Sequence, residues 1–222
     1  MCGRFALFGN GSFGYESLHL PDPPPFESYN IAPTQNILAI RASPETGRVE
    51  YALLHWGLVP FWSKTAKTPY PLINARVEGI EKKPSFRSPF KHRRCIIPAS
   101  GFFEWRQIDA GKQPYFIRPT DGGYFGLAGL WDHWQGEGGG VIESCSIITT
   151  VANGLMREIH DRMPAILKVQ DVEAWLESGS EQSDVLEMLA PYPDYLMEAY
   201  PVSHYVNSHR HNSPECVANL TP

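Results

Sequence analysis

The sequence of 222 residues is poor in cysteine and contains no long apolar run. Its four cysteines are scattered, and no two of them form a C-x-x-C pair: Cys2, Cys95, Cys145 and Cys216. This spacing is unsuited to a zinc site, and a disulfide framework is not expected at this length. The chain opens without a signal peptide, and no stretch is long enough to span a bilayer. We therefore expect a protein of the cytoplasm, or of the nucleus in a eukaryote, with no membrane partner, metal or cofactor.

An overall positive charge is also lacking, because the net charge is −5, which by itself argues against a nucleic-acid partner. The charge is unevenly distributed, however. Residues 62–118 carry twelve Lys or Arg and four acids, a net +8, which leaves −13 for the remainder. This asymmetry predicts one basic surface facing an anionic partner. The alternative is that the basic run at 91–94 is only a surface turn.

Short apolar segments separated by Gly- and Pro-rich turns dominate the chain. They predict strands at 4–8, 37–40, 49–59, 94–99, 102–107, 115–118, 124–132, 141–151 and 202–206. The pair 94–99 and 102–107 is expected to form a hairpin. Short helices are expected at 78–90, broken by Pro84 and Pro89, and at 156–159, 171–177 and 181–189. The pattern predicts one α+β domain over residues 1–222, with a core at 2–215 and a tail at 216–222. Its curved, mainly antiparallel sheet or partial β-barrel carries peripheral helices.

The stretch with the most distinctive chemistry is Met1-Cys2-Gly3-Arg4. If Met1 is removed, Cys2 carries a free α-amine and a thiol on adjacent carbons. Their ordinary pKa values of about 8 and about 8.5 leave each a nucleophilic fraction near neutral pH. Such a 1,2-aminothiol condenses with an aldehyde to an imine and then closes a thiazolidine ring. The alternative is an incidental cysteine on a frayed terminus, although the apolar residues that follow indicate a strand.

Two further segments that are expected to be extended carry polar side chains suited to binding or catalysis. Asn74 and Arg76 lie two positions apart and share a face of an extended chain, where an amide can hold an oxygen and a guanidinium a phosphate. They can also simply satisfy backbone groups. Glu104 lies between Phe103 and Trp105, where a raised pKa would suit general acid-base catalysis. The alternative places Glu104 on a solvent-exposed face.

The remaining candidates are histidines and tryptophans. His160 beside Asp161 and Arg162 is suited to proton transfer with an orienting carboxylate, or is a helix-ending residue in a surface ion pair. Trp56 and Trp62 either stack on bases or belong to the core. The polar segment near the end of the chain holds two histidines, which without a third ligand are a weak metal signal: His209 and His211.

Six motifs occur together in one order: MCGRF, YNIAPTQ, WGLVPFW, NARVE, GFFEW and IHDRMP. Together they resemble the SOS-response-associated peptidase family, whose members are abasic-site processing proteins, over essentially one whole domain. The resemblance implies that the protein removes its own Met1 and that the Cys2 amine attacks the aldehyde of an abasic site in single-stranded DNA. A thiazolidine crosslink then shields the lesion. It also implies a nucleoid-associated monomer, with any replication-associated partner unknown.

The resemblance also implies residue roles. Cys2 is the nucleophile, Asn74 positions Cys2 and a sugar oxygen, Glu104 transfers protons in sugar opening and imine formation, and His160 transfers protons to the sugar, including crosslink reversal. The DNA contacts fall into phosphate holders, Arg4, Arg76 and Arg162, and residues that shape the DNA path, Asn30, Trp62 and Trp105. Relatives commonly carry a basic residue before the Phe of a Ser-Phe segment; here Pro84 intervenes, with Lys82 and Lys83 beside it.

Two other functions stay open from the residues alone. One is an N-terminal-nucleophile amidohydrolase, in which the Cys2 thiol attacks amides and its amine acts as the base. The other is a noncovalent single-stranded DNA-binding module in which Cys2 is incidental.

Overall fold

The computed structural model describes residues 2–9, 13–66 and 70–221. Its strands are β1 (Phe5–Leu7), β2 (Ser28–Ile31), β3 (Asn36–Ala42), β4 (Val49–Trp56), β5 (Asn74–Arg76), β6 (Arg94–Ala99), β7 (Gly101–Ile108), β8 (Gly111–Pro119), β9 (Phe125–Gln135), β10 (Val141–Val151), β11 (Arg162–Pro164), β12 (Ile166–Leu167) and β13 (Met197–Pro201). The α-helices are α1 (Arg87–His92), α2 (Gly154–Arg157), α3 (Val172–Leu176) and α4 (Gln182–Glu187). Short 3-10 turns are η1 (Glu16–Leu18), η2 (Val169–Asp171), η3 (Asp194–Leu196), η4 (His204–Asn207) and η5 (Pro214–Cys216).

Five strands close into a barrel. They pair in the order β10, β4, β3, β6 and β9, and β9 then pairs with β10 to complete the ring. The β10–β4 contact is parallel, whereas the other four are antiparallel. Strands β5, β11 and β12 extend this sheet. Closure satisfies the backbone groups that an open sheet leaves at its edges.

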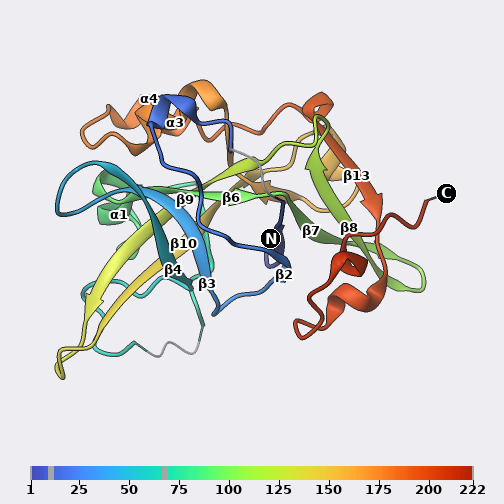
Figure 1. Cartoon of the computed structure of the whole chain (residues 1–222), viewed down its shortest axis with the longest axis horizontal. Helices are drawn as coiled ribbons and strands as arrows, with labels where there is room; N and C mark the ends of the chain where they lie inside the picture. Colours follow the sequence, from blue (N-terminus) through green and yellow to red (C-terminus); the bar gives the residue numbers. More distant parts are fainter. Residues whose placement is uncertain (1, 10–12, 67–69, 222) are drawn as a thin grey trace.

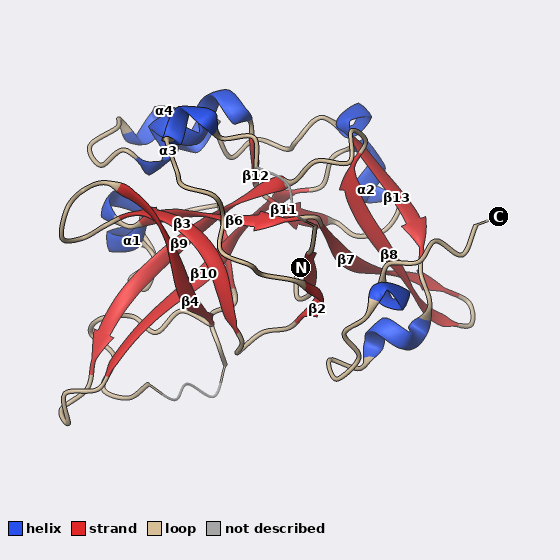
Figure 2. Cartoon of the chain, in the orientation of Figure 1, coloured by secondary structure: helices blue, strands red, loops and turns tan. Residues whose placement is uncertain are grey.

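A second sheet lies beside the barrel (Figure 1). Its five strands run in the order β13, β8, β7, β1 and β2, and all neighbours are antiparallel. The helices lie at the periphery of the two sheets (Figure 2). The predicted α+β architecture with a curved, mainly antiparallel sheet and peripheral helices is therefore confirmed. The boundary expected at residues 215 and 216 stays a prediction, although Cys216 itself is buried.

The N-terminal strand β1 is an interior strand, since it pairs with β2 on one side and β7 on the other. Phe5 packs edge-on against Trp56 with ring centroids 5.2 Å apart, and both side chains are buried. Trp56 is thus a core residue. Because Cys2 is also fully buried, the frayed-terminus alternative is wrong from residue 2 onward. Met1, whose removal the sequence analysis expects, lies outside the described residues.

The hairpin expected between 94–99 and 102–107 is wrong. β6 belongs to the barrel and β7 to the five-stranded sheet, so the chain changes sheets at Ser100. Ser100 is held against β1, because its N–H donates to Ala6 O at 2.8 Å and its hydroxyl bonds both backbone groups of Phe8. This long-range pairing replaces the local turn, and the hairpin that does form joins β7 to β8.

Two other elements of the structure differ from those expected from the sequence. The helix expected at 78–90 begins only at Arg87, because turns occupy the residues before it; Pro89 is tolerated in the first helical turn, where its missing N–H has no partner to lose. The strand expected at 202–206 is instead η4. Ser203 begins this turn and its hydroxyl accepts a hydrogen bond from the Tyr205 N–H.

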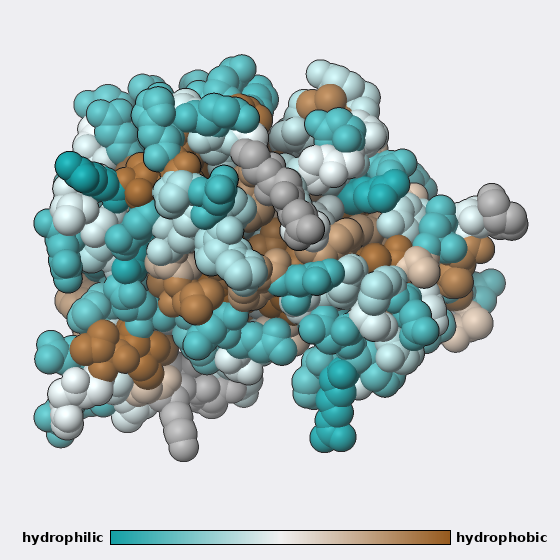
Figure 3. Space-filling view, viewed as in Figure 1, coloured by the Kyte–Doolittle hydropathy of each residue, from teal (hydrophilic) through white to brown (hydrophobic). Residues whose placement is uncertain are grey.

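Hydrophilic side chains cover most of the viewed face, and apolar side chains show in separate patches across its middle and at its lower left (Figure 3). None of the helices in the described part of the chain has the length and apolar character needed to cross a bilayer.

The close packing at the point where the chain passes from one sheet to the other predicts that Gly101→Ala destabilises the protein. An added Cβ would lie 2.5 Å from Ile117 O and would also strike the Phe116 ring. We expect a loss of about 1–3 kcal/mol in the free energy of unfolding, as for other overpacked interiors. Urea unfolding measures it. Gly138→Ala, where an added Cβ meets nothing within 4 Å, is the matched control. Equal stability of the two variants would contradict the prediction.

Candidate active site

Cys2 is held in place by Asn74. The Asn74 amide, on β5, donates from Nδ2 to the Cys2 carbonyl oxygen at 2.9 Å, and the Cys2 Sγ lies 4.0 Å from Arg4 O. The other amide atom, Asn74 Oδ1, is buried and accepts no hydrogen bond from any residue that the structure describes. Asn74 therefore fixes the Cys2 backbone and retains an acceptor for a further donor.

Glu104 is buried, with 3% of its surface exposed, so the alternative of a solvent-facing residue is wrong. It lies on β7, opposite Tyr115 of β8. Burial raises the pKa of the Glu104 carboxyl, and nearby His160 opposes the rise. Burial also raises the pKa of the Cys2 thiol to about 12, and the charge of Glu104 adds to that effect. The thiol is thus protonated at neutral pH, with a titratable carboxyl close by.

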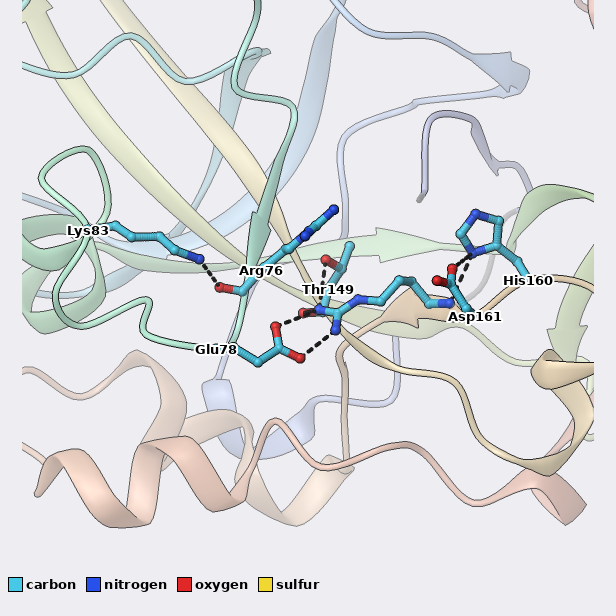
Figure 4. Close-up of polar contacts among 7 residues, drawn as sticks. Arg76, Glu78, Lys83, Thr149, His160 and Asp161 are labelled. Atoms are coloured by element: carbon cyan, nitrogen blue, oxygen red, sulfur yellow. Dashed lines mark hydrogen bonds and ion pairs between the residues drawn. The ribbon is translucent and has the colours of Figure 1, made fainter.

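His160 follows α2, whose first turn is capped by the Asn153 side chain accepting from the Met156 N–H. The His160 backbone N–H donates to Met156 O at 2.7 Å and holds the backbone from which the ring projects. His160 Nδ1 lies 3.0 Å from the Arg162 N–H and 2.9 Å from Asp161 Oδ1 (Figure 4). A neutral ring accepts from the backbone and a protonated ring donates to Asp161, so the ring has a partner in either state.

A basic pocket of about 660 Å³ has His160 in its lining. Arg162 Nη2 donates to Glu78 Oε2 at 3.0 Å and to Thr149 O at 2.7 Å, and Nη1 bonds Glu78 Oε1. This pairing lowers the pKa of Glu78 and offsets the Arg162 charge. The Arg76 side chain is exposed, and Lys83 Nζ reaches the Arg76 carbonyl at 3.3 Å (Figure 4). Arg76 and Lys83 therefore supply most of the free positive charge here.

A second pocket, which we call the Trp105 pocket, also has His160 in its lining. Its volume is about 680 Å³, and it is lined by Glu104, Trp105, Lys112, His160, His204 and Asn207. His160 lines both pockets. The structure thus brings together the four predicted catalytic residues, together with three predicted DNA-binding residues: Arg76, Trp105 and Arg162.

Arg4 and Asn30 form a separate cluster that lines neither pocket. Arg4 Nη1 donates to Asn30 Oδ1 at 2.7 Å and to Val206 O at 2.9 Å. Asn30 is buried, and its Nδ2 lies within hydrogen-bonding distance of three carbonyls, those of Val206, Ser208 and His211. These two residues hold the segment after β13 in place. Their predicted contact with DNA stays a prediction.

Trp62 is 54% exposed, and its indole N–H donates to Pro84 O at 3.4 Å. The neighbouring backbone is anchored by the buried Asp132, whose Oδ2 accepts from the Phe61 N–H at 2.9 Å. The Trp62 ring is thereby presented next to the segment that carries Lys83. A stacking role for Trp62 stays a prediction that this exposure favours.

The basic run at 91–94 is not simply a surface turn. Arg94 is buried, and its guanidinium bonds carbonyls at the ends of α1 and α3, including Phe90 O at 2.9 Å and Trp175 O at 2.5 Å. Arg93 pairs with Asp132 at 3.0 Å. Half of this run therefore stabilises the fold.

Sequence analysis missed three residues that complete the wall of the Trp105 pocket, because they lie far from Glu104 and His160 in the chain: Lys112, His204 and Asn207. In the sequence, Lys112 is only one of many basic residues. The region around His204 was expected to be a strand, which hid its place beside Trp105.

The described ranges contain no group of three His, Cys, Asp or Glu side chains placed to hold a metal ion. His211 instead stacks on Tyr205, with ring centroids 3.8 Å apart, and its Nδ1 lies 2.6 Å from Tyr205 O.

The chain matches known proteins over nearly its full length. The sequence model of the SOS response associated peptidase (SRAP) family matches residues 1–209. The abasic site processing protein YoqW of Bacillus subtilis is 43% identical over 223 residues, covering 98% of this chain and 99% of that protein. The abasic site processing protein HMCES of Xenopus tropicalis is 32% identical, covering 87% of this chain and 66% of that protein.

Solved structures show the same fold. A crystal structure of a protein from Bacteroides thetaiotaomicron has a TM-score of 0.77 at 33% identity, covering 86% of this chain and 85% of that one. A protein from Bordetella bronchiseptica has a TM-score of 0.78 at 25% identity, covering 91% of this chain and all of that one.

The buried Glu104 predicts a pH-dependent difference between wild type and Glu104→Gln. Its raised pKa means that the native protein keeps this proton to higher pH than the unfolded chain. The free energy of unfolding of the wild type therefore falls as pH rises from about 4.5 through the raised pKa of Glu104. The Glu104→Gln variant, which has no proton to lose there, shows no such fall. Urea unfolding at several pH values should show Glu104→Gln gaining stability relative to wild type over this window.

The exposed Glu137→Gln is the matched control, for which we expect no such trend. A constant difference between Glu104→Gln and wild type at every pH would contradict the raised pKa.

Proposed function

The chain belongs to the SOS response associated peptidase family, and from this premise we propose that it processes abasic sites in single-stranded DNA by forming a covalent crosslink through Cys2. The relatives named as abasic site processing proteins support the substrate. The observation that carries the proposal is the cluster around Cys2. One amide holds its carbonyl, and a buried carboxyl of raised pKa lies beside its thiol.

The reaction begins once the protein has removed its own Met1. An abasic sugar opens to an aldehyde when its ring oxygen gains a proton and its hydroxyl loses one, and we assign these transfers to His160 and Glu104. The Cys2 amine then adds to the aldehyde carbon. Loss of one water, with a proton from Glu104, leaves an imine. The thiol sulfur adds to the imine carbon, its proton passes to the nitrogen, and a thiazolidine ring results.

The environment of Glu104 suits both directions of proton transfer. Burial raises the pKa of the Glu104 carboxyl, so its carboxylate is a stronger base than an exposed one and its acid form persists to higher pH, which suits a group that both accepts and gives a proton. Asn74 would hold the Cys2 backbone and offer its free Oδ1 to a sugar hydroxyl. His160 would give and take protons at the sugar, including during crosslink reversal.

The Cys2 thiol makes direct attack on an amide the weaker alternative. With a pKa of about 12, little of it is thiolate at neutral pH, and the thiolate is the form that attacks. Addition to an imine is an easier task, because the electrophile is already activated and the base lies nearby. This difference favours the aminothiol mechanism over an amidohydrolase.

The surface around the site suits a single DNA strand. Arg76 and Lys83 present positive charge in the basic pocket, and Trp62 and Trp105 offer aromatic surface. Stacking contributes about 1–3 kcal/mol per base, and phosphate contacts add to it, so local binding can outweigh the net charge of −5. The protein would act as a monomer, in the nucleoid or, in a eukaryote, in the nucleus.

The test is denaturing gel electrophoresis of the protein incubated with single-stranded DNA that contains one abasic site. We expect a heat-stable shifted band whose intact mass lacks Met1. The band should be absent with Cys2→Ala and with DNA that has an intact base. Noncovalent binding of Cys2→Ala, measured by fluorescence anisotropy, should stay close to wild type, because the phosphate and stacking contacts remain.

Three outcomes separate the candidate functions. No shifted band from protein with a free Cys2 terminus would refute crosslinking and redirect attention to amide substrates. A band that persists in Cys2→Ala would place the nucleophile elsewhere. Salt-sensitive binding without any crosslink would favour a simple single-strand-binding module.

A further inference from the structure

We propose that the Trp105 pocket binds the nucleotide on one side of the abasic sugar, with Lys112 and His204 on its phosphate, while the basic pocket binds the phosphate on the other side. This inference rests on the proposed function and specifies how the strand passes the site. Lys112, His204 and Asn207 are then DNA-binding residues that no sequence motif identifies.

The arrangement of the two pockets is the first argument. His160 lines both of them, and Glu104, whose charge acts on the Cys2 thiol, lines the Trp105 pocket. The reacting sugar must lie near Cys2, Glu104 and His160, and hence where the two pockets meet. A strand that continues in both directions from that sugar can then place one flanking nucleotide in each pocket.

The chemistry of the Trp105 pocket is the second argument. Lys112 lies on β8 opposite Gln107 of β7, is exposed, and forms no ion pair with any residue in the described ranges. Glu104 is the one acidic residue among the six that line the pocket, and it is buried, whereas Lys112 and His204 are exposed. The pocket therefore presents a free cation beside an aromatic ring, the combination that a phosphate and its base require.

Hydrogen bonds preorganise this wall. The Trp105 indole N–H donates to Asn207 Oδ1 at 2.8 Å, which orients the ring. Asn207 Nδ2 lies 3.3 Å from His204 Nδ1. An amide nitrogen can only donate, so in this contact Nδ1 accepts and Nε2 of the neutral ring carries the proton. His204 thus has an N–H available for a phosphate oxygen.

The same wall gives Arg4 and Asn30 a role. They bond the carbonyl of Val206, directly before Asn207, and Asn30 also holds the carbonyls of Ser208 and His211. They act as positioning residues for the Trp105 pocket, because the segment that carries His204 and Asn207 cannot shift while these contacts hold.

The experiment uses the full chain with Cys2→Ala, so that binding is measured at equilibrium. The probes are two short single strands bearing a tetrahydrofuran abasic analogue, one with nucleotides only 5′ of it and one with nucleotides only 3′ of it. We expect Lys112→Ala to weaken binding about 2- to 5-fold for one strand and to leave the other unchanged. Lys83→Ala, in the basic pocket, should show the opposite selectivity.

Salt dependence gives a second readout. For the affected strand, Lys112→Ala should reduce the slope of log K against log salt by about 0.7, the loss expected for one phosphate contact on a single strand. Asn207→Ala should weaken binding to the same strand as Lys112→Ala, because it releases both Trp105 and His204. Lys168→Ala, an exposed lysine that lines neither pocket, is the matched control.

Equal effects of Lys112→Ala on both strands, or no effect on either, would overturn the proposal. Crosslinking by the protein with native Cys2 is measured in parallel on DNA that extends on both sides of an abasic site. If that crosslink fails, the proposed function fails; if it forms while the strand selectivity is absent, only the Trp105 pocket assignment is wrong.

Discussion

The pairing of β1 between β2 and β7 is the constraint on which the rest of the site depends. A residue so close to the start of a chain is ordinarily mobile, and a mobile nucleophile has no fixed distance to its acid-base partners. Here the strand that begins three residues after Cys2 is interior to a sheet, and Asn74 holds the Cys2 carbonyl. A terminal residue thereby gains the order of a core residue.

Burial has a chemical consequence as well as a structural one. The same packing that fixes Cys2 raises the pKa of its thiol and of Glu104. A protonated thiol is a poor first nucleophile, which favours amine attack first and ring closure second. Glu104 is suited to assist both steps because its environment makes it a weaker acid than an exposed carboxyl. In the proposed mechanism, the fold thus sets the order in which Cys2 forms its two bonds.

Much of the fold was predictable because most strands are visible in the sequence as short apolar segments bounded by turn residues. The segment 141–151 is β10 with the same bounds, and the strand expected at 4–8 contains β1. The change of sheets at Ser100 was not predictable, since it depends on a pairing with β1 from almost a hundred residues earlier. Ser203 likewise begins a turn where apolar residues indicated a strand.

For the site, the sequence indicated which residue types could act in catalysis or binding, but not which residues contact them in the fold. Phe103-Glu104-Trp105 suggested a carboxyl of raised pKa, but whether the strand's face was buried depends on what packs against it. Arg162 was expected to bind a phosphate, but in the structure Glu78 pairs with it and offsets its charge. The wall formed by Lys112, His204 and Asn207 comes from two distant segments and carries no local signal.

The central claim is that both functional groups of Cys2 end in one ring, and the crosslinked adduct itself tests it. An imine and a thiazolidine have the same mass, but only the imine gains two hydrogens from borohydride, and only the ring consumes the thiol. The measurement is intact mass of the adduct after borohydride and after alkylation of thiols under denaturing conditions. Of the four cysteines, three should be alkylated and no hydrogen gained, whereas a Cys2→Ser adduct should be reduced. Four alkylated thiols with two added hydrogens in the wild-type adduct would contradict the ring.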